Sequence, residues 1–141
     1  MKLYRVYSAF LLFFIFSQIA FAQVNSDVKS VLTNIIELSK AKKYEEAGKY
    51  IAFYANEKKK DYKVAVLTNK DQLNFVKRIA KKISALAEVS NSFNIGAVTL
   101  SKDNGFEFQS VTVEFVSGTQ KISSQFKFVT IGGTLLLAEI E

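Results

Sequence analysis

Residues 93–140, FNIGAVTLSKDNGFEFQSVTVEFVSGTQKISSQFKFVTIGGTLLLAEI, decide the fold class of this chain. Apolar side chains recur here mostly at every second position, which is the period of a β-strand. Residues that tolerate the positive φ of tight turns, such as Asp103-Asn104-Gly105 and Gly132-Gly133, interrupt this pattern. The interruptions leave four extended segments, at 93–102, 106–116, 121–131 and 134–140. Short turns between extended segments predict consecutive hairpins, and hence a four-stranded antiparallel meander.

The second of these segments changes its apolar phase. Phe106 and Phe108 occupy even positions, whereas Val111, Val113 and Phe115 occupy odd ones. A β-bulge near residues 109–110 would return both sets to one face of the sheet, because one extra residue shifts all later side chains to the opposite face. The alternative is a strand that is buried on both faces at one end.

Upstream of the sheet, the apolar spacing is helical. Between residues 25 and 43 it follows three- and four-residue steps, which predicts an amphipathic helix. A short helix is expected from Tyr44, and a third from a cap at Asn69 or Asp71 to about Glu88. The side chains expected to point inward from the short helix are Ala47, Tyr50, Ile51 and Tyr54. Helices followed by an antiparallel sheet make the chain an α+β protein.

The segment that joins the second and third helices is mostly charged between residues 56 and 63, which predicts a solvated link. The lysines at 58–60 would alternatively attract an anionic surface. Apolar residues then follow, and they predict a brief strand or a buried connection: Tyr62, Val64, Val66 and Leu67.

The N-terminal segment has the three parts of a secretory signal peptide. Lys2 and Arg5 are basic, an apolar stretch follows, and Ala20 and Ala22 give a small-x-small ending. The apolar run is short for a bilayer, where roughly 20 residues are needed. A retained N-terminal anchor is the alternative. We therefore expect residues 1–22 to be removed, leaving a single domain at 23–141 that is periplasmic or secreted and has no stable membrane insertion.

Composition excludes several chemistries. The chain of 141 residues is 49% apolar and 23% charged, which is typical of globular domains. It has no Cys and no His, so it has no thiol nucleophile, no disulfide and no imidazole proton shuttle. No phosphate-cradling glycine loop or calcium-loop spacing is present, and neither a cofactor nor a metal is predicted.

The order and size of the elements resemble the NTF2-like superfamily, in which three helices and a curved sheet form a cone. The resemblance covers residues 23–141 and is closest at Tyr44-Glu45-Glu46-Ala47-Gly48-Lys49-Tyr50-Ile51, at the long helix ending near Leu86, and at the final two strands, 126–129 and 135–140. It implies an NTF2-like cone with a pocket between the sheet and the helices. It also implies a homodimer formed through the sheet. A cystatin-like or another helix-on-sheet domain would show much of the same pattern.

Enzymes of this superfamily use an Asp, or an Asp–His pair, with oriented tyrosines. Without His the dyad is excluded, and no catalytic residue carries over by a matching motif. Glu114 is the best candidate for a general base, because burial between Val113 and Phe115 would raise its pKa. Strand alternation favours the other interpretation, in which Glu114 lies on the outer face.

Aromatic side chains are the candidate ligand-binding residues. Six are expected to line an apolar pocket, with the tyrosine hydroxyls at its mouth: Tyr50, Tyr54, Phe75, Phe108, Phe126 and Phe128. The alternative is that they form the hydrophobic core of a small domain.

The function predicted from the sequence is an exported, non-catalytic binding or interaction module. Its partner would be a small apolar ligand or a protein, and no nucleic acid is expected. The alternatives are a carboxylate-based isomerase or hydrolase, and a basic protein of the membrane surface that uses the lysines at 58–60 and the basic residues at 77–82.

Overall fold

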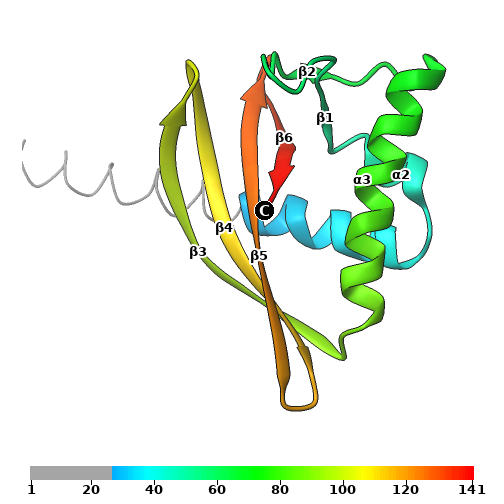
Figure 1. Ribbon diagram of the computed structural model, residues 1–141, viewed down its shortest axis with the longest axis vertical. Coiled ribbons are helices and arrows are strands. Elements are labelled where there is room, and N and C mark those ends of the chain that lie inside the picture. The colour runs from blue at the N-terminus through cyan, green and yellow to red at the C-terminus, as the bar shows by residue number, and fades with distance from the viewer. Residues whose placement is uncertain (1–26) are drawn as a thin grey trace, which may run out of the picture.

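The computed structural model describes residues 27–141, and the predicted signal peptide at 1–22 lies outside this range. The first helix runs through residues 27–40 and is followed by α2 (Tyr44–Gly48) and α3 (Lys70–Glu88). Figure 1 shows α2 and α3 side by side at one flank of the molecule. The predicted order, helices first and sheet last, is confirmed.

Four strands form the main sheet in the order β3-β4-β5-β6, each antiparallel to its neighbour. The strands are β3 (Ser92–Asp103), β4 (Phe106–Ser117), β5 (Gln120–Ile131) and β6 (Thr134–Ile140). Their bounds agree with the segments expected from the sequence to within a residue or so. The first hairpin turns through Asn104 and Gly105, with φ of 48° and 82°, so its turn residues adopt the left-handed conformation that their types predicted.

The predicted β-bulge at residues 109–110 of β4 is wrong. The ladder between β4 and β5 is continuous from Phe108↔Val129 to Ser117↔Gln120. The irregularity lies in β3, where two residues between Ile95 and Val98 oppose one residue of β4. A second lies in β6, between the pairs Lys127↔Glu139 and Phe128↔Leu137.

The change of apolar phase in β4 instead reflects burial on both faces. Phe108 packs in one buried cluster, and Val111, Val113 and Phe115 pack in another. Since successive side chains of a strand point to opposite faces, the two clusters lie on the two sides of the sheet. We call these the helix-covered face and the loop-covered face.

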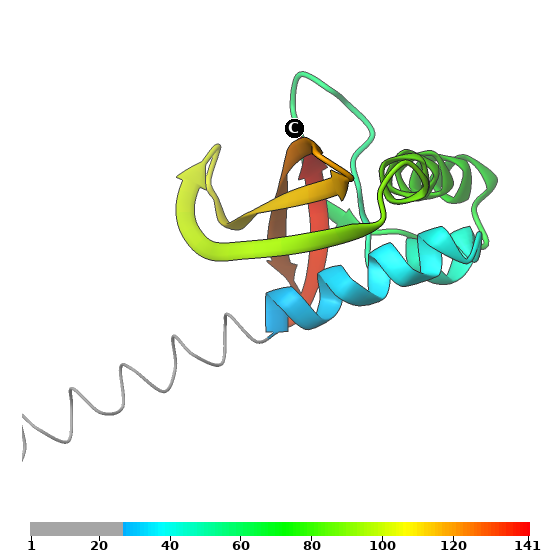
Figure 2. The ribbon, with the colours of Figure 1, turned by 90° about the horizontal axis from the view of Figure 1, so that it is seen from below.

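The helix-covered face forms the larger core. The sheet contributes Val113, Phe115, Phe126 and Phe128, each at most 1% exposed, and Leu32, Ile35 and Ile83 come from the helices. In Figure 2 the first helix lies along the underside of the strands, with α2 and α3 beyond its end.

Close packing between the helices explains a glycine in α2. A Cβ on Gly48 would lie 2.6 Å from Cγ2 of Val76 in α3. The glycine weakens α2 by its low helix propensity but lets the two helices approach.

The loop-covered face is closed by the chain between α2 and α3. This segment contains the short strands β1 (Ala52–Phe53) and β2 (Lys63–Val64), which pair with each other. Tyr62, only 5% exposed, packs with Phe108, Val129 and Leu136. The predicted connection is therefore a brief strand with one buried flank, while Val64 and Val66 are exposed.

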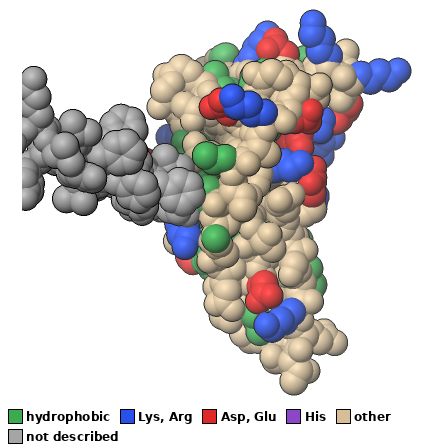
Figure 3. All heavy atoms as spheres, turned by 90° about the vertical axis from the view of Figure 1, so that its left-hand side faces the viewer, with side chains coloured by type: hydrophobic (Ala, Val, Ile, Leu, Met, Phe, Trp, Pro, Cys, Tyr) green, Lys and Arg blue, Asp and Glu red, His purple; other side chains and the backbone are tan. Residues whose placement is uncertain are grey.

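The two edge strands of the main sheet, β6 and β3, differ in what lies beside them. Leu137 of β6 donates its backbone N–H to the carbonyl of Tyr50 at 2.8 Å, beside a parallel bridge to Ile51. β3 forms the other edge, and Leu100 on it is 64% exposed. Figure 3, which views the side that bears β3, shows hydrophobic side chains only as small separate patches.

Candidate functional site: an aromatic hollow beside α3

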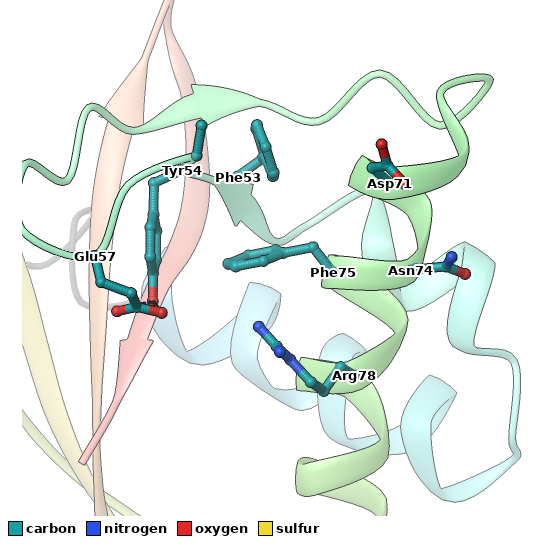
Figure 4. A pocket seen from close by; sticks show the side chains of 8 residues that line it. Phe53, Tyr54, Glu57, Asp71, Asn74, Phe75 and Arg78 are labelled. Atoms are coloured by element: carbon teal, nitrogen blue, oxygen red, sulfur yellow. Dashed lines mark hydrogen bonds between the residues drawn. The ribbon is translucent and has the colours of Figure 1, made fainter.

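A hollow of about 510 Å³ lies between α3 and the chain that follows β1. Its volume is within the range of ligand-binding pockets. Eight residues line it: Phe53, Tyr54, Ala55, Glu57, Asp71, Asn74, Phe75 and Arg78. We call it the aromatic hollow, and Figure 4 shows Phe75 reaching from α3 toward Tyr54.

One wall is set by the start of α3. The side chain of Asn69 accepts hydrogen bonds from the backbone N–H groups of Asp71 and Gln72 at 3.0 and 3.1 Å, which fixes the first turn. Residues three and four apart on a helix are neighbours, so Asp71, Phe75 and Arg78 share one face. The cap predicted at Asn69 is thus what orients this wall.

The opposite wall is the chain from Phe53 to Glu57. The Asn56 side chain accepts hydrogen bonds from the backbone N–H groups of Lys58 and Lys59 at 2.8 and 3.4 Å, which turns the chain sharply after Tyr54. The turn brings Glu57 back toward Tyr54, whose hydroxyl donates to the carboxylate at 3.3 Å.

Three half-buried rings form the apolar part of the hollow. Phe75 contacts Phe53 with ring centroids 5.3 Å apart, and contacts Tyr54 at 5.0 Å, both edge to face. Such pairs are favourable beyond their area of burial. The rings therefore hold one another in place before any ligand binds.

Three charged side chains line the hollow: Asp71 lies in the first turn of α3, and Glu57 and Arg78 border the rings without pairing with each other. Arg78 lies over the ring of Phe75, 5.4 Å from its centroid, and Glu57 accepts from Tyr54 on the other wall. The two side chains are farther apart than the 4.0 Å of an ion pair. Burial, and next the charge of Glu57, raise the pKa of Tyr54, so its phenol stays protonated at neutral pH.

Behind Tyr54 lies an ionic cluster on the loop-covered face. Glu139 of β6 accepts hydrogen bonds from Lys60, at 2.5 Å, and from the hydroxyl of Tyr62. Nζ of Lys127 is 3.7 Å from Glu139 and 2.5 Å from Glu141. We call these five residues the Glu139 cluster, and it adjoins the aromatic hollow because Tyr54 and Tyr62 pack edge to face at 5.6 Å.

The bulge in β6 places Glu139 in this cluster. An unbroken ladder would carry the pairing from Phe128↔Leu137 to Phe126↔Glu139 and direct the carboxylate toward the apolar core. With the bulge, Lys127 pairs with Glu139 and Phe126 pairs with Ile140. One extra residue therefore exchanges a carboxylate for an apolar side chain on the helix-covered face.

The electrostatics keep Glu139 ionised. Burial acts to raise its pKa, but hydrogen bonds from Lys60 and Tyr62, together with the lysine charges, outweigh burial and hold the pKa below its ordinary value. Burial and the bond to Glu139 in turn raise the pKa of Tyr62 far above its ordinary range. The cluster thus suits the attachment of the loop better than the transfer of a proton, since a general base works best with a pKa near the operating pH.

The structure separates the six aromatic residues predicted from the sequence. Tyr54 and Phe75 line the aromatic hollow. Phe108 lies in the smaller cluster, 5.7 Å from the ring of Tyr62, whereas Phe126 and Phe128 are fully buried among the helices. Tyr50 is half-buried against the helix-covered core.

Glu114 lies on the same face as Phe108 but beyond the covering loop, and its side chain is 41% exposed. It pairs with Lys121 at 3.3 Å, as expected for the outer-face interpretation. Several basic residues are also engaged: Lys77 pairs with Glu45 at 2.5 Å, and Lys81 lies over the ring of Tyr44.

Sequence reasoning missed Phe53, Arg78 and Glu139 as parts of a site. Arg78 is one of the basic residues at 77–82, and only its i, i+3 spacing from Phe75 indicates the stacked pair. The contact between Lys60 and Glu139 spans 79 positions of the chain, and no local pattern announces it.

Over residues 27–141, no group of three or more acidic side chains is arranged to hold a metal ion. Within the same range, no helix has the length and hydropathy needed to cross a membrane.

Comparisons of this chain with protein-family models, with curated proteins and with solved structures find no match.

Proposed function

We propose that this protein is an exported, non-catalytic binding protein that holds a small ligand with an apolar body in the aromatic hollow. The observation that carries the proposal is the convergence of Phe53, Tyr54 and Phe75 on a hollow of about 510 Å³. Rings already packed against one another lose little freedom when a ligand binds, which favours affinity.

The NTF2-like resemblance remains part of this proposal, with a different placement of the ligand. The family likeness implies a pocket between the main sheet and the helices. Phe126 and Phe128 occupy that space with no exposed surface, so they support the core interpretation. We therefore place the ligand outside the sheet, between α3 and the chain after β1.

Binding is preferred to catalysis because of the Glu139 cluster. This carboxylate facing a tyrosine is the arrangement closest to a carboxylate-based isomerase site. Its oxygen Oε1 is already bonded to Lys60 and Tyr62, and its pKa is lowered rather than raised. A base that must first break an ion pair is a poor proton acceptor.

Native mass spectrometry tests the proposal on the protein purified from an exporting host. We expect an additional mass that is lost on denaturation, and we expect Phe75→Ala to lower its occupancy. Phe93→Ala is the matched control, because Phe93 is also partly buried but packs on Phe115, away from the hollow. A native mass equal to that of the chain alone, with no binding of indole or of its amino-acid derivatives up to millimolar concentration, would overturn the proposal.

Export and self-association belong to the same proposal. N-terminal sequencing of the recovered protein is expected to begin at Gln23. Among the described strands, β3 pairs on one side only, with β4, so we expect a homodimer formed through the sheet. Light scattering would give its mass.

A further inference from the structure

We infer that the aromatic hollow is built for a zwitterion with an aromatic body, the chemical class of an aromatic α-amino acid. This inference rests on the proposed binding function and specifies the ligand of the same site. The observation that carries it is that Arg78 and Glu57 border the rings with opposite charges and do not form an ion pair with each other.

Arg78 is the cationic side of the hollow. Within residues 27–141 its guanidinium makes no hydrogen bond or ion pair, and its contact is with the ring of Phe75 at 5.4 Å. Its neighbour Lys77, by contrast, is paired with Glu45 at 2.5 Å. Stacking on a ring fixes the plane of a guanidinium, and its fork of N–H donors matches a carboxylate bidentately.

Glu57 is the anionic side. Its carboxylate accepts a hydrogen bond from the hydroxyl of Tyr54, which lies 3.3 Å from both carboxylate oxygens. Most of its acceptor capacity therefore stays open, and an ammonium group would fill it. Figure 4 shows Glu57 and Arg78 entering the hollow from opposite walls, Glu57 from the loop and Arg78 from α3.

The pair of charges discriminates between ligand classes. A ligand with only a carboxylate would satisfy Arg78 but face the negative charges of Glu57 and Asp71. A ligand with only an ammonium group would leave Arg78 without an anionic partner. A zwitterion satisfies both, and its ring replaces water on the exposed surfaces of Phe53, Tyr54 and Phe75. Charge complementarity thus favours a ligand that carries both a carboxylate and an ammonium group.

Isothermal titration calorimetry on the protein recovered from the exporting host tests the inference with four probes of equal ring size. These are L-tryptophan, N-acetyl-L-tryptophan, L-tryptophan amide and indole. We expect L-tryptophan to bind about tenfold more tightly than either singly charged analogue.

Variants assign each charge to its group. Arg78→Gln is expected to abolish the preference for L-tryptophan over its amide and leave the preference over the N-acetyl compound. Glu57→Gln is expected to do the reverse. Lys77→Gln, one position from Arg78 but outside the hollow, should change neither ratio.

The possible failures are distinct. If indole binds as tightly as L-tryptophan, the zwitterion inference is wrong and the proposed binding function stands. The same conclusion follows if none of the four probes binds although a ligand is present in the native mass spectrum. If no probe binds and no ligand is present, both the inference and the proposed function fail.

Discussion

The two faces of the main sheet are covered in different ways. On β5, Phe128 points to the helix-covered face and is fully buried, while its neighbour Val129 points to the loop-covered face and is 2% exposed. Helices enclose Phe128, and the backbone groups within a helix hydrogen-bond to one another. Val129 is enclosed by a loop, and that loop is anchored by side chains.

This difference separates stability from binding. The helix-covered core is apolar and continuous, so its cost of disruption is set by lost packing. The cover of the other face depends on the pairing of Lys60 and Tyr62 with Glu139, and the same loop supplies Tyr54 and Glu57 to the aromatic hollow. Removal of the charge of Glu139 on β6 is therefore expected to change ligand binding in the aromatic hollow, because the same loop contacts both.

The largest expected effect is on the helix-covered face. Phe128→Ala should lower the free energy of unfolding by about 3–5 kcal/mol, because the surrounding helices cannot collapse into the space it leaves. Phe108→Ala should cost less, since the loop above Phe108 can move inward. Urea denaturation followed by circular dichroism measures both, and equal costs would break the comparison between the faces.

The second effect is on the anchor of the loop. Glu139→Gln should lower the free energy of unfolding by about 1–2 kcal/mol, because it removes a charge-assisted hydrogen bond that is largely shielded from water. Glutamine can still accept from Tyr62, so the shape of the cluster is kept. Ligand affinity at the hollow should fall in parallel, and a stability loss without any change in affinity would separate the loop anchor from the site.

The pH dependence of stability follows from the same cluster. The pKa of Glu139 in the folded protein lies below its ordinary value of 4.5, so its contribution is complete above that value and is lost as the pH falls through the lowered pKa. The pKa of Tyr62 is raised above its ordinary 10.0, so its contribution is complete below that pH and is lost at higher pH. Glu139→Gln should flatten the acid limb in urea denaturations between pH 3 and pH 7, and an unchanged acid limb would contradict the assignment.

Local patterns predicted the backbone of this protein better than its site. The helix cap at Asn69, the end of α3 at Glu88 and the four strands all follow from periodicity and turn residues, which act over a few positions. The change of apolar phase in β4 is also visible in the sequence, but it reflects burial of side chains on both faces of the strand and not a local bulge. Periodicity records which side chains are buried, and it does not say what buries them.

The site depends on contacts that local patterns cannot encode. Phe108 and Phe128 both occupy even positions on adjacent strands, yet Phe108 pairs with Val129, so the two rings point to opposite faces. The placement of Glu139 depends on a single extra residue in β6, and the partner Lys60 lies in a segment that reads as a solvated link. Register and bulges are set by the assembled sheet. The sequence therefore identified the aromatic residues as apolar contacts, but it did not predict which of them line the hollow and which lie in the buried clusters.

The smallest expected effect comes from Glu114, which shares the face of Glu139 but lies beyond the loop. Both carboxylates pair with lysine, so the cover is the main difference between them: the Glu139 side chain is 15% exposed and that of Glu114 is 41% exposed. Solvent and salt screen the exposed pair, and Glu114→Gln should change the free energy of unfolding by no more than about 0.5 kcal/mol. A double-mutant cycle with Lys121→Gln measures the coupling directly, and the corresponding cycle of Glu139→Gln with Lys60→Gln should give a larger value that resists added salt. If the two couplings are equal, the loop contributes no shielding, and the ionic anchor assigned to the loop-covered face would have to be abandoned.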